Sequence, residues 1–467
     1  MTTESEELAA ETPAEEEAYS LAPKTIAAIL YAVDIDDREK LTELMEPLHA
    51  ADIADLLEQI NAYDRARLIR LYDREFDGEI LSELDESIRE EVIGILAPNV
   101  LADAVRELES DDVVDLVEYL EEPQQEAILD ALEESDRVAV EQALSYPEGS
   151  AGRLMQREVV MAPEHWNVGQ AIDYMRSAES LPDQFYHIVL VDPRLHPIGN
   201  ITLGKIMAAR REVPLADLTE DIFKVIPIDQ DEEDVAYAFN QYHLISAPVV
   251  DGEGRLVGQI TIDDAMIVLD EEHEEDILRL AGVGESSLAD RVIDTVKGRF
   301  PWLAVNLATA ILASLVIGLF DATIQQMVAL AVLMPIVASM GGNAGTQTMT
   351  VTVRALATKD IDIYNASRII RREAAVGLIN GCLFALIIGA VAGAWFMSPG
   401  LGGIIAAAMV INMLAAALAG ILLPLLLDKI GADPAIASAV FVTTVTDVVG
   451  FSSFLGLATL LIDQLVP

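Results

Sequence analysis

Residues 433–450 read DPAIASAVFVTTVTDVVG, and they open an apolar run that continues to Ile462. Between Pro434 and Ile462 one side chain is ionisable, Asp447, and it lies almost at the midpoint. A helix of this length can cross the hydrocarbon core of a bilayer, which is about 30 Å thick. A carboxylate at that depth is costly and marks a functional site by default, although it can also bond neighbouring helices together. The run therefore predicts a membrane-spanning helix with Asp447 at its functional centre, and helix-to-helix bonding is the alternative.

Four further apolar segments precede this run, and each is long enough for a membrane span. We predict five spans, at about 300–320, 324–350, 374–396, 401–427 and 434–462. Basic residues of this half lie only before the first span and in the loops after the second and fourth spans. By the positive-inside rule, the N-terminal half is then cytoplasmic and Pro467 is outside. The sequence thus predicts a multi-pass protein of the cell (inner) membrane in the lipid bilayer.

The charges divide the chain near Arg299. Of 29 basic and 78 acidic residues, 22 and 70 precede Arg299. An excess of carboxylates argues against a nucleic-acid partner, which needs a basic surface, and points to cations. The alternative for most of these acids is a solvated surface adapted to high salt. The lone Cys382 excludes an intramolecular disulfide.

The soluble half divides into a helical part and a strand-and-helix part. We expect residues 1–20 to be a disordered acidic tail. Residues 21–149 show short amphipathic helical patterns broken at Pro47, Gly78, Pro98 and Pro123, which predict stacked helical hairpins in a superhelical domain. No catalytic cluster is present in this part.

Residues 150–270 contain an internal repeat. The stretch 192–202 (DPRLHPIGNIT) aligns without gaps on 251–261 (DGEGRLVGQIT), 59 residues later, and each copy predicts strands joined by a turn and followed by a helix. The pair resembles tandem CBS domains, at about 153–215 and 217–270. Such pairs commonly bind adenine nucleotides, which implies Tyr186, Thr261 and Asp264 as nucleotide-binding residues. The first copy has Lys205 where the second has Asp264, so a regulatory or dimerising module without ATP is an equal alternative.

Residues 271–298 predict an acidic connecting helix ahead of the first span. Six of the seven residues from Asp270 to Asp276 are acids, and apolar helical spacing follows from Ile277. Such a run is usually a solvated helix end. It is also well placed to bind divalent ions and to be moved by them.

Two polar stripes lie at membrane depth. Asn343, Thr346, Gln347 and Thr350 share one face of the second span, and the glycines at 341, 342 and 345 permit close helix approach or a locally non-helical backbone. In the last span Thr443, Thr446, Asp447 and Gly450 share a face. Amide, hydroxyl and carboxylate oxygens without Lys, His or Cys suit hard cations such as Mg2+ or Ca2+.

The order of these parts resembles the MgtE family of magnesium channels and transporters. The match rests on Met334-Pro335 with the run GGNAGTQT at 341–348, and on Asp433-Pro434 with VTTVTD at 442–447. The resemblance implies a homodimer with the pore on its two-fold axis, lined by Asp447, Asn343, Thr346, Gln347 and Thr443. It also implies that cytoplasmic Mg2+ closes the pore. The predicted regulatory metal ligands are Asp111, Asp112, Asp263, Asp264, Glu274, Glu275, Asp276 and Asp433.

The fold class expected is therefore a multidomain membrane protein: an N-terminal α-helical superhelix, tandem α/β CBS domains, a connecting helix and a transmembrane domain at 299–467 with five helices. The function expected is a Mg2+-selective channel or transporter. Transport of Mn2+, Co2+ or Ca2+ is one alternative, and a CBS-regulated ion sensor without transport is another. An intramembrane enzyme is not expected, because this half lacks a Ser/His or Cys/His pair, a HExxH motif and a second acid within a span.

Overall fold

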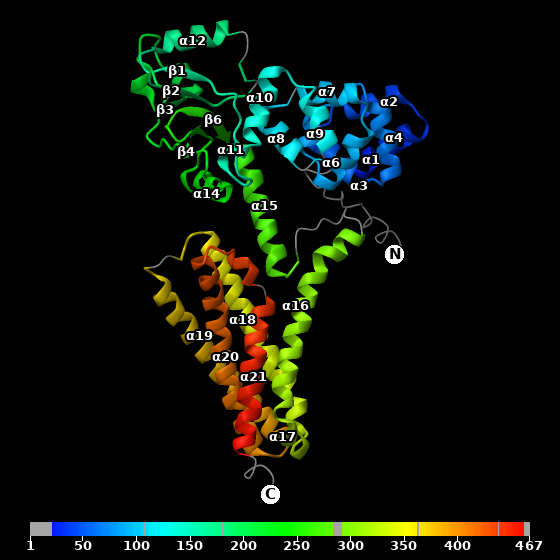
Figure 1. The fold of residues 1–467 in the computed structure, drawn as a ribbon, viewed down its shortest axis with the longest axis vertical. Helices are drawn as coiled ribbons and strands as arrows, with labels where there is room; N and C mark the ends of the chain where they lie inside the picture. Colours follow the sequence, from blue (N-terminus) through cyan, green and yellow to red (C-terminus); the bar gives the residue numbers. More distant parts are fainter. Residues whose placement is uncertain are drawn as a thin grey trace, which may run out of the picture. The chain divides into compact units, whose positions relative to one another are not determined.

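A computed structural model describes residues 21–461, apart from 107, 119, 121, 179–180, 183, 284–291, 362–363 and 438. The predicted tail at 1–20 and the predicted outside terminus Pro467 lie outside the described residues. The chain divides into two units, residues 1–270 and 271–467. Each unit has its own core, and Figure 1 shows the elements of both.

The first part of the soluble unit consists of short helices (Figure 1), as the sequence predicts. Polar caps define their starts: the Asn61 side chain accepts hydrogen bonds from the amides of Tyr63 and Asp64, and His49 forms a capping box with Asp52. The helices are α1 (Pro23–Asp34), α2 (Arg38–Met45), α3 (Ala50–Gln59), α4 (Ala62–Tyr72), α5 (Glu79–Ser82), α6 (Glu86–Ile95), α7 (Pro98–Arg106), α8 (Ser110–Glu118), α9 (Glu122–Leu129) and α10 (Glu134–Ala143).

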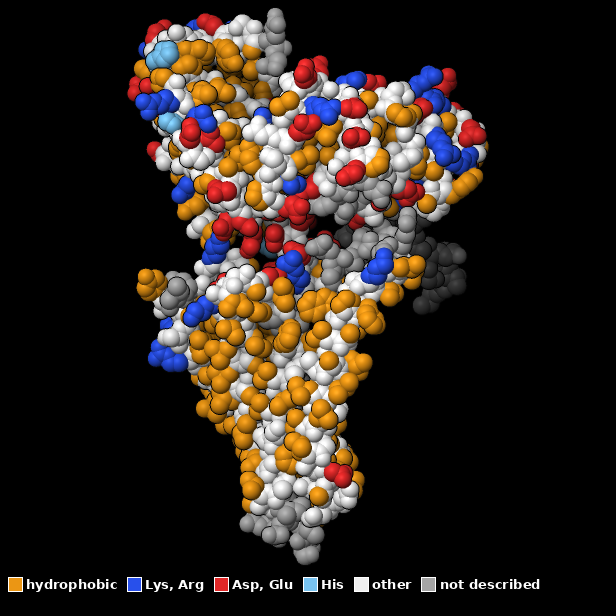
Figure 2. All heavy atoms as spheres, in the orientation of Figure 1, with side chains coloured by type: hydrophobic (Ala, Val, Ile, Leu, Met, Phe, Trp, Pro, Cys, Tyr) orange, Lys and Arg blue, Asp and Glu red, His pale blue; other side chains and the backbone are white. Residues whose placement is uncertain are grey.

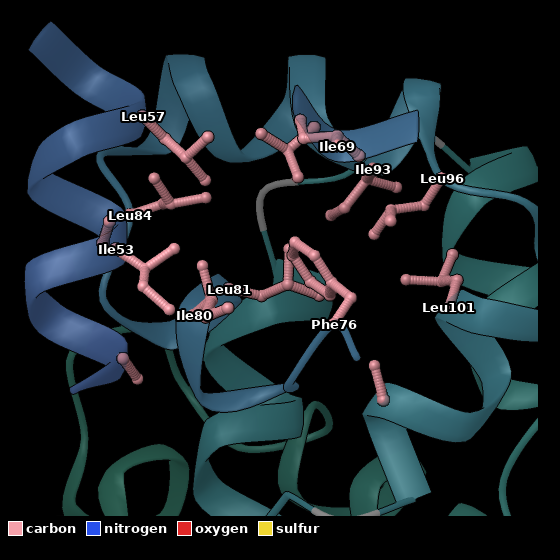
Figure 3. Close-up of a cluster of buried hydrophobic side chains, with 14 of the residues drawn as sticks. Ile53, Leu57, Ile69, Phe76, Ile80, Leu81, Leu84, Ile93, Leu96 and Leu101 are labelled. Carbon is pink, nitrogen blue, oxygen red and sulfur yellow. The ribbon is translucent and has the colours of Figure 1, made fainter. Parts of the chain in front are cut away.

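One continuous hydrophobic core joins these helices. Figure 3 shows labelled side chains of this core pointing toward one another from α3 to α7 and from the connections that hold Phe76, Leu84 and Leu96. Burial of such aliphatic side chains is the main force that holds short helices together, because isolated helices of this length are marginal in water. The α8 helix supplies Val113, Val114, Leu116 and Val117 to the core, which fixes the orientation of the acids at its start.

Residues 151–270 form two three-stranded sheets, in strand orders β1-β2-β3 and β4-β5-β6. In each sheet the first two strands are parallel and the last two antiparallel, with the same register irregularity near the strand ends. The elements are α11 (Ala151–Leu154), β1 (Met161–Pro163), α12 (Val168–Ser177), β2 (His187–Val191), β3 (Pro197–Thr202), α13 (Leu203–Ala208), η1 (Leu215–Leu218), β4 (Ile226–Pro227), α14 (Glu232–Tyr242), β5 (Ser246–Val250), β6 (Leu256–Thr261) and α15 (Ile262–Leu280).

The two copies of the repeat meet through equivalent positions. His187 and Ser246 are 59 residues apart and both begin the second strand of their sheet. His187 Nδ1 lies 2.8 Å from Ser246 Oγ, and both residues are buried. Burial lowers the pKa of His187, so the imidazole is neutral near pH 7. The internal repeat read from the sequence is therefore a structural repeat as well.

The second unit contains five helices that are long and apolar enough to cross a membrane. Hydrophobic side chains cover their visible face in Figure 2. The helices of this unit after α15 are α16 (Val292–Gly318), α17 (Asp321–Gln326), α18 (Ala329–Ala357), α19 (Ala366–Trp395), α20 (Pro399–Lys429), η2 (Pro434–Ala437) and α21 (Ala439–Leu460). The number of spans agrees with the prediction.

Helix boundaries differ from the prediction at three places. The predicted connecting helix at 271–298 is not one helix: α15 begins in the soluble unit, ends at Leu280, and is followed by Gly282 with φ +68°, while α16 begins at Val292. The second span begins at Ala329, after the separate helix α17, and the last at Ala439, after the short helix η2. A left-handed glycine ends a helix readily, and apolar periodicity does not register such a turn.

Candidate functional site

The polar stripe of α18 lies on a face that the single chain leaves uncovered. Asn343, Gln347 and Thr350 are exposed and Thr346 is half-buried. The opposite face of α18 is buried and consists of Gly341, Gly342, Gly345 and Met349 among others. Asn343 lies at the middle of the span Ala329–Ala357. Exposed amides at that depth are unfavourable against lipid, so this face needs water or another protein surface.

The α21 stripe brings the carboxylate of Asp447 to a comparable depth. Asp447 and Thr443 are half-buried, while Thr446 is fully buried. The two threonine hydroxyls donate to carbonyl oxygens of their own helix, Thr443 to Val440 at 3.1 Å and Thr446 to Thr443 at 2.9 Å. Among the residues that the structure describes, Asp447 has no hydrogen bond or ion pair. The helix-bonding alternative raised by the sequence thus has no support in this chain.

Glycines let α18 and α21 approach closely. A Cβ added at Gly345 would lie 2.4 Å from Val442 Cγ1, and one at Gly342 would lie 3.3 Å from Thr443 Cγ2. The α18 helix is continuous through these glycines, so of the two predicted roles the structure shows close approach and not unwinding. The contact places Thr443 beside Gly342, next in sequence to Asn343. The two polar stripes therefore belong to neighbouring helices at one level.

Asn412 on α20 is a polar residue of this region that the sequence reading missed. It is fully buried, and its Nδ2 donates to the Val337 carbonyl of α18 at 2.8 Å. A Cβ at Gly341 would lie 2.2 Å from Asn412 Nδ2, and one at Gly450 would lie 2.8 Å from it. Asn412 therefore fits between α18 and α21. The sequence could have indicated Asn412, because it is the one polar residue between Leu401 and Leu427.

In the soluble unit, the predicted acids of α8 and α15 gather in one cluster. The charge of Asp264 raises the pKa of Asp111, and that of Asp112 contributes to the raised pKa of Asp264. Burial is the largest cause in each case: it raises the pKa of Asp111 well above its ordinary value, that of Asp112 to about 6 and that of Asp264 to about 7. Asp263 is exposed and adds its charge to the same field.

Two further acids belong to this cluster and were not predicted, Glu109 and Glu158. Burial, followed by the charge of Glu158, raises the pKa of Glu109 to about 7. Ser110 Oγ donates to Glu158 Oε2 at 2.8 Å and accepts from the Arg157 amide at 2.9 Å. Glu109 directly precedes the Ser-Asp-Asp run of α8, so the sequence held a signal for it. Glu158 is distant in sequence and had none.

The described residues include no group of three or more His, Cys, Asp or Glu side chains arranged to hold a metal ion. The acidic cluster is thus a region of high negative charge and not a preformed cage of protein ligands. A hydrated cation fits such a region, because Mg2+ keeps several of its waters and uses few carboxylates.

The remaining predicted ligands divide between α15 and the segment after α20. Arg279 forms ion pairs with Glu275 and with Asp433, whose Oδ1 also accepts from the Ala435 amide at 2.7 Å. Burial and the charge of Asp433 raise the pKa of Asp276. Glu274 is exposed, and no ion pair of it occurs among the described residues. The structure thus brings Glu275, Asp276 and Asp433 together around an arginine that the sequence reading had not considered.

The predicted nucleotide residues lie in the CBS pair. Thr261 Oγ1 donates to Asp264 Oδ2 across the start of α15, so these two residues are already bonded to each other. Tyr186 is 47% exposed. In the first copy Lys205 instead forms an ion pair with Glu220 at 3.1 Å. The two copies therefore present different groups at equivalent places.

These features define a multi-pass membrane protein with a CBS-bearing soluble part and an oxygen-lined pair of spans. Family models match in the same order: the MgtE intracellular N domain at 48–149, the CBS domain at 151–212 and 215–271, and the divalent cation transporter MgtE at 334–457. The chain belongs to the MgtE family of magnesium transporters. Its N-terminal domains are accordingly cytosolic, and the predicted family and fold class are confirmed.

Similar proteins carry the same description. The magnesium transporter MgtE of Enterococcus faecalis is 31% identical over 326 residues, which cover 70% of this chain and 72% of that protein. The magnesium transporter MgtE of Thermus thermophilus is 33% identical over 327 residues, which cover 69% of this chain and 72% of that protein. Among solved structures, the cytosolic domain of the Mg2+ channel MgtE in complex with ATP is 28% identical, with a TM-score of 0.48, and covers 52% of this chain and 99% of that one.

Proposed function

We propose that this protein conducts Mg2+ across the cell membrane through a pore lined by the stripes of α18 and α21. The observation that carries the proposal is Asp447, a carboxylate near the middle of a span with no partner among the described residues. Family membership supports Mg2+ as the substrate. Asp447 attracts the cation, and the exposed amides of Asn343 and Gln347, with the hydroxyls of Thr346 and Thr443, are hydrogen-bonding groups for its water shell.

The complete pore requires a second copy of the chain. In one chain the polar face of α18 is exposed at a depth where lipid would leave its amides without partners. A homodimer with this face on its two-fold axis would enclose water and would bring two copies of Asp447 near one doubly charged ion. With the cytosolic part on one side and five spans among the described residues, the end of α21 would lie at the outer membrane surface.

Cytosolic Mg2+ closes this pore by binding to the acidic regions of the cytosolic part. Burial is the main cause of the raised pKa values of Glu109, Asp111 and Asp264, and the charges of neighbouring acids raise these pKa values further, so these carboxylates repel one another when ionised. A divalent cation relieves this repulsion, so it favours the state in which these acids are packed together. The candidate ligands are Asp111, Asp112, Asp263 and Asp264, with a second group at Glu274, Glu275, Asp276 and Asp433.

An adenine nucleotide is a further regulatory ligand in this proposal. Asp264 would bind its ribose, with Thr261 and Tyr186 beside it. Since Asp264 also belongs to the acidic cluster, occupancy by ATP and by Mg2+ would be coupled at that residue. Electrophysiology with Mg2+ varied on the cytosolic side, with and without ATP, measures this coupling.

The pore assignment is tested by Asp447→Ala in full-length protein reconstituted in proteoliposomes. We expect Mg2+ uptake to be abolished while the protein still folds and dimerises, because the cation loses its one membrane-depth carboxylate per chain. Asp321→Ala is the matched control, since Asp321 is exposed in the first turn of α17 and bonds only Gln325 among the described residues. Uptake at the wild-type rate by Asp447→Ala would refute the pore assignment.

The same assay separates the alternative functions. Competition by Mn2+, Co2+ and Ca2+ for Mg2+ uptake decides which divalent ion is preferred. The absence of any flux in the wild-type protein under all internal Mg2+ concentrations would instead favour an ion sensor without transport.

A further inference from the structure

Three arginines near the start of α19 lack carboxylate partners in a chain rich in carboxylates. Arg368, Arg371 and Arg372 are exposed and form no ion pair within the described part of the chain. Arg371 Nε donates to the Ser367 carbonyl of its own helix at 3.0 Å. Arginines elsewhere differ in this respect: Arg176, Arg194 and Arg210 also form no ion pair among the described residues, but they are dispersed over the CBS pair and do not share one helix face. Ten arginines do form ion pairs with Asp or Glu: Arg38, Arg65, Arg67, Arg89, Arg106, Arg137, Arg153, Arg211, Arg255 and Arg279.

The three arginines share one face at an unfavourable end of their helix. Their spacing of three and four residues places them together on α19, which begins at Ala366. The N-terminal turns of a helix carry partial positive charge, so cations there are repelled. Neither an acid of the described residues nor the helix dipole offsets these charges. An anion from outside the chain would offset the charges of the three arginines and the partial positive charge of the helix N-terminus.

The position of this face identifies the kind of anion. The candidate span of α19 is Ala366–Trp395, so the arginines lie in its first turns and the apolar run follows directly. A short connection joins α19 to α20, which makes them antiparallel neighbours, so the start of α19 lies at the same membrane surface as the end of α20. That end leads to Asp433, which pairs with Arg279 of α15, the helix that leaves the cytosolic unit. The arginine face therefore lies at the cytosolic membrane surface.

We propose that the exposed face formed by Arg368, Arg371 and Arg372 binds the phosphate of an anionic lipid headgroup. Guanidinium groups bind phosphate through two parallel hydrogen bonds, and lipid phosphates lie at the depth of these first helical turns. Arg354 in the last turn of α18 is also exposed and extends the basic surface. The positive-inside rule accounts for the side of the membrane on which these residues lie, and it does not account for three arginines on one face without counter-charges.

The test measures lipid preference of the full-length protein by native mass spectrometry. Detergent-solubilised protein is offered phosphatidylglycerol and phosphatidylcholine in equal amounts. We expect wild type to retain phosphatidylglycerol preferentially, and Arg368→Gln/Arg371→Gln/Arg372→Gln to lose at least about tenfold of that preference, since each basic residue near an anionic surface contributes about fivefold. The control Arg176→Gln/Arg194→Gln/Arg210→Gln removes three exposed charges from the CBS pair and should retain the preference. A triple α19 variant with wild-type preference overturns the proposal.

Two further arms keep the test decisive. If the triple variant fails to insert, Arg371→Gln alone should lose about fivefold of the preference, and Arg371→Lys should retain most of it. No change in Arg371→Gln then overturns the proposal. Inorganic phosphate is the second arm: if wild type shows no preference for phosphatidylglycerol but binds phosphate that the triple variant does not bind, the face is a free-phosphate site and the headgroup is excluded.

Discussion

Carboxylates occur in two opposite arrangements in this protein, one in each unit. Within the membrane unit a single acid, Asp447, lies half-buried near mid-span with no partner among the described residues. In the cytosolic unit at least five acids crowd the starts of α8 and α15, and burial with mutual repulsion raises the pKa of Glu109 and Asp264 to about 7. A lone carboxylate attracts an ion without trapping it. Several ionised carboxylates held close together destabilise the folded state, and binding of a cation or of protons relieves their repulsion.

The membrane carboxylate and the cytosolic carboxylates depend on different kinds of structural support. In the proposed pore, Asp447 depends on neighbouring helices that hold the polar stripes at one level, and the close glycine contacts of α18 provide this. The cytosolic acids are held by a hydrophobic core beneath α8, so their charge can vary while the backbone stays in place. Helix packing thus sets the geometry of the membrane carboxylate, and the state of the cytosolic cluster depends mainly on its charge.

The largest effect is expected where packing is removed from the membrane site. In Gly420→Ala, on α20, the new Cβ would lie 2.6 Å from the Gly345 carbonyl oxygen and 3.0 Å from the Met349 amide nitrogen. Backbone atoms cannot rotate away, so α18 must move, at a cost of about 1–3 kcal/mol. We expect nearly complete loss of Mg2+ uptake in proteoliposomes. Gly403→Ala on the same helix has free space around the Cβ and should behave as wild type.

Equal uptake by the two α20 variants would show that the α18–α20 contact does not set the geometry of the pore. The conclusion that helix packing controls the membrane site would then be wrong.

A smaller effect is expected from charge in the cytosolic unit. Because the folded pKa values of Glu109, Asp112 and Asp264 are raised to about 6–7, the folded state binds protons that the unfolded state releases. The stability of this region should rise as pH falls from 8 to 5 and be lost again as pH rises through 6–7. Asp111→Asn removes one buried charge and should raise stability at pH 8 and flatten this dependence. Thermal unfolding of the full-length protein without Mg2+ measures both.

Asp55→Asn is the control for that experiment, because Asp55 is an exposed acid on α3. It should leave the pH dependence unchanged. A wild-type stability that falls on acidification over the same range would contradict the assignment of repulsion to this cluster.

The smallest effect is expected at Arg279, whose ion pairs join α15 to the segment after α20. Arg279 is half-exposed and pairs with Glu275 and Asp433, and such pairs are worth about 0–1 kcal/mol. In Arg279→Gln the acids at this place repel one another, so we expect the open fraction at low cytosolic Mg2+ to rise about two- to threefold. High Mg2+ should still close the pore. Patch recordings at graded Mg2+ measure this, and Arg279→Lys, which keeps the charge, should resemble wild type.

Most of the fold could be predicted from the sequence because its signals are periodic. Apolar runs gave five spans, helical spacing gave the N-terminal helices, and the 59-residue repeat gave the CBS pair. The boundaries at Leu280 and Ala439 could not be predicted in the same way. They depend on a left-handed glycine and on the short helix η2, which apolar periodicity does not reveal.

The candidate site was predicted less completely. Asp447 and the α18 stripe stand out because polar residues are rare within apolar runs, and Asn412 stands out for the same reason although it was overlooked. Glu158 and Arg279 could not be recognised, since their roles come from residues that are distant in sequence, Ser110 and Asp433. Among 78 acids, identity alone carries little information about which are crowded. Only the folded arrangement shows that.

The bond between His187 and Ser246 has a consequence for how the two CBS copies can change. Equivalent positions of the internal repeat hold a ring nitrogen and a hydroxyl, and each is the partner of the other. Recombination that made the copies identical would place two imidazoles or two hydroxyls in this buried contact. Two imidazoles would be too large for this buried space, and two hydroxyls would leave part of it empty. The two halves of the repeat are therefore no longer interchangeable, and a substitution in one sets which substitutions its twin can accept.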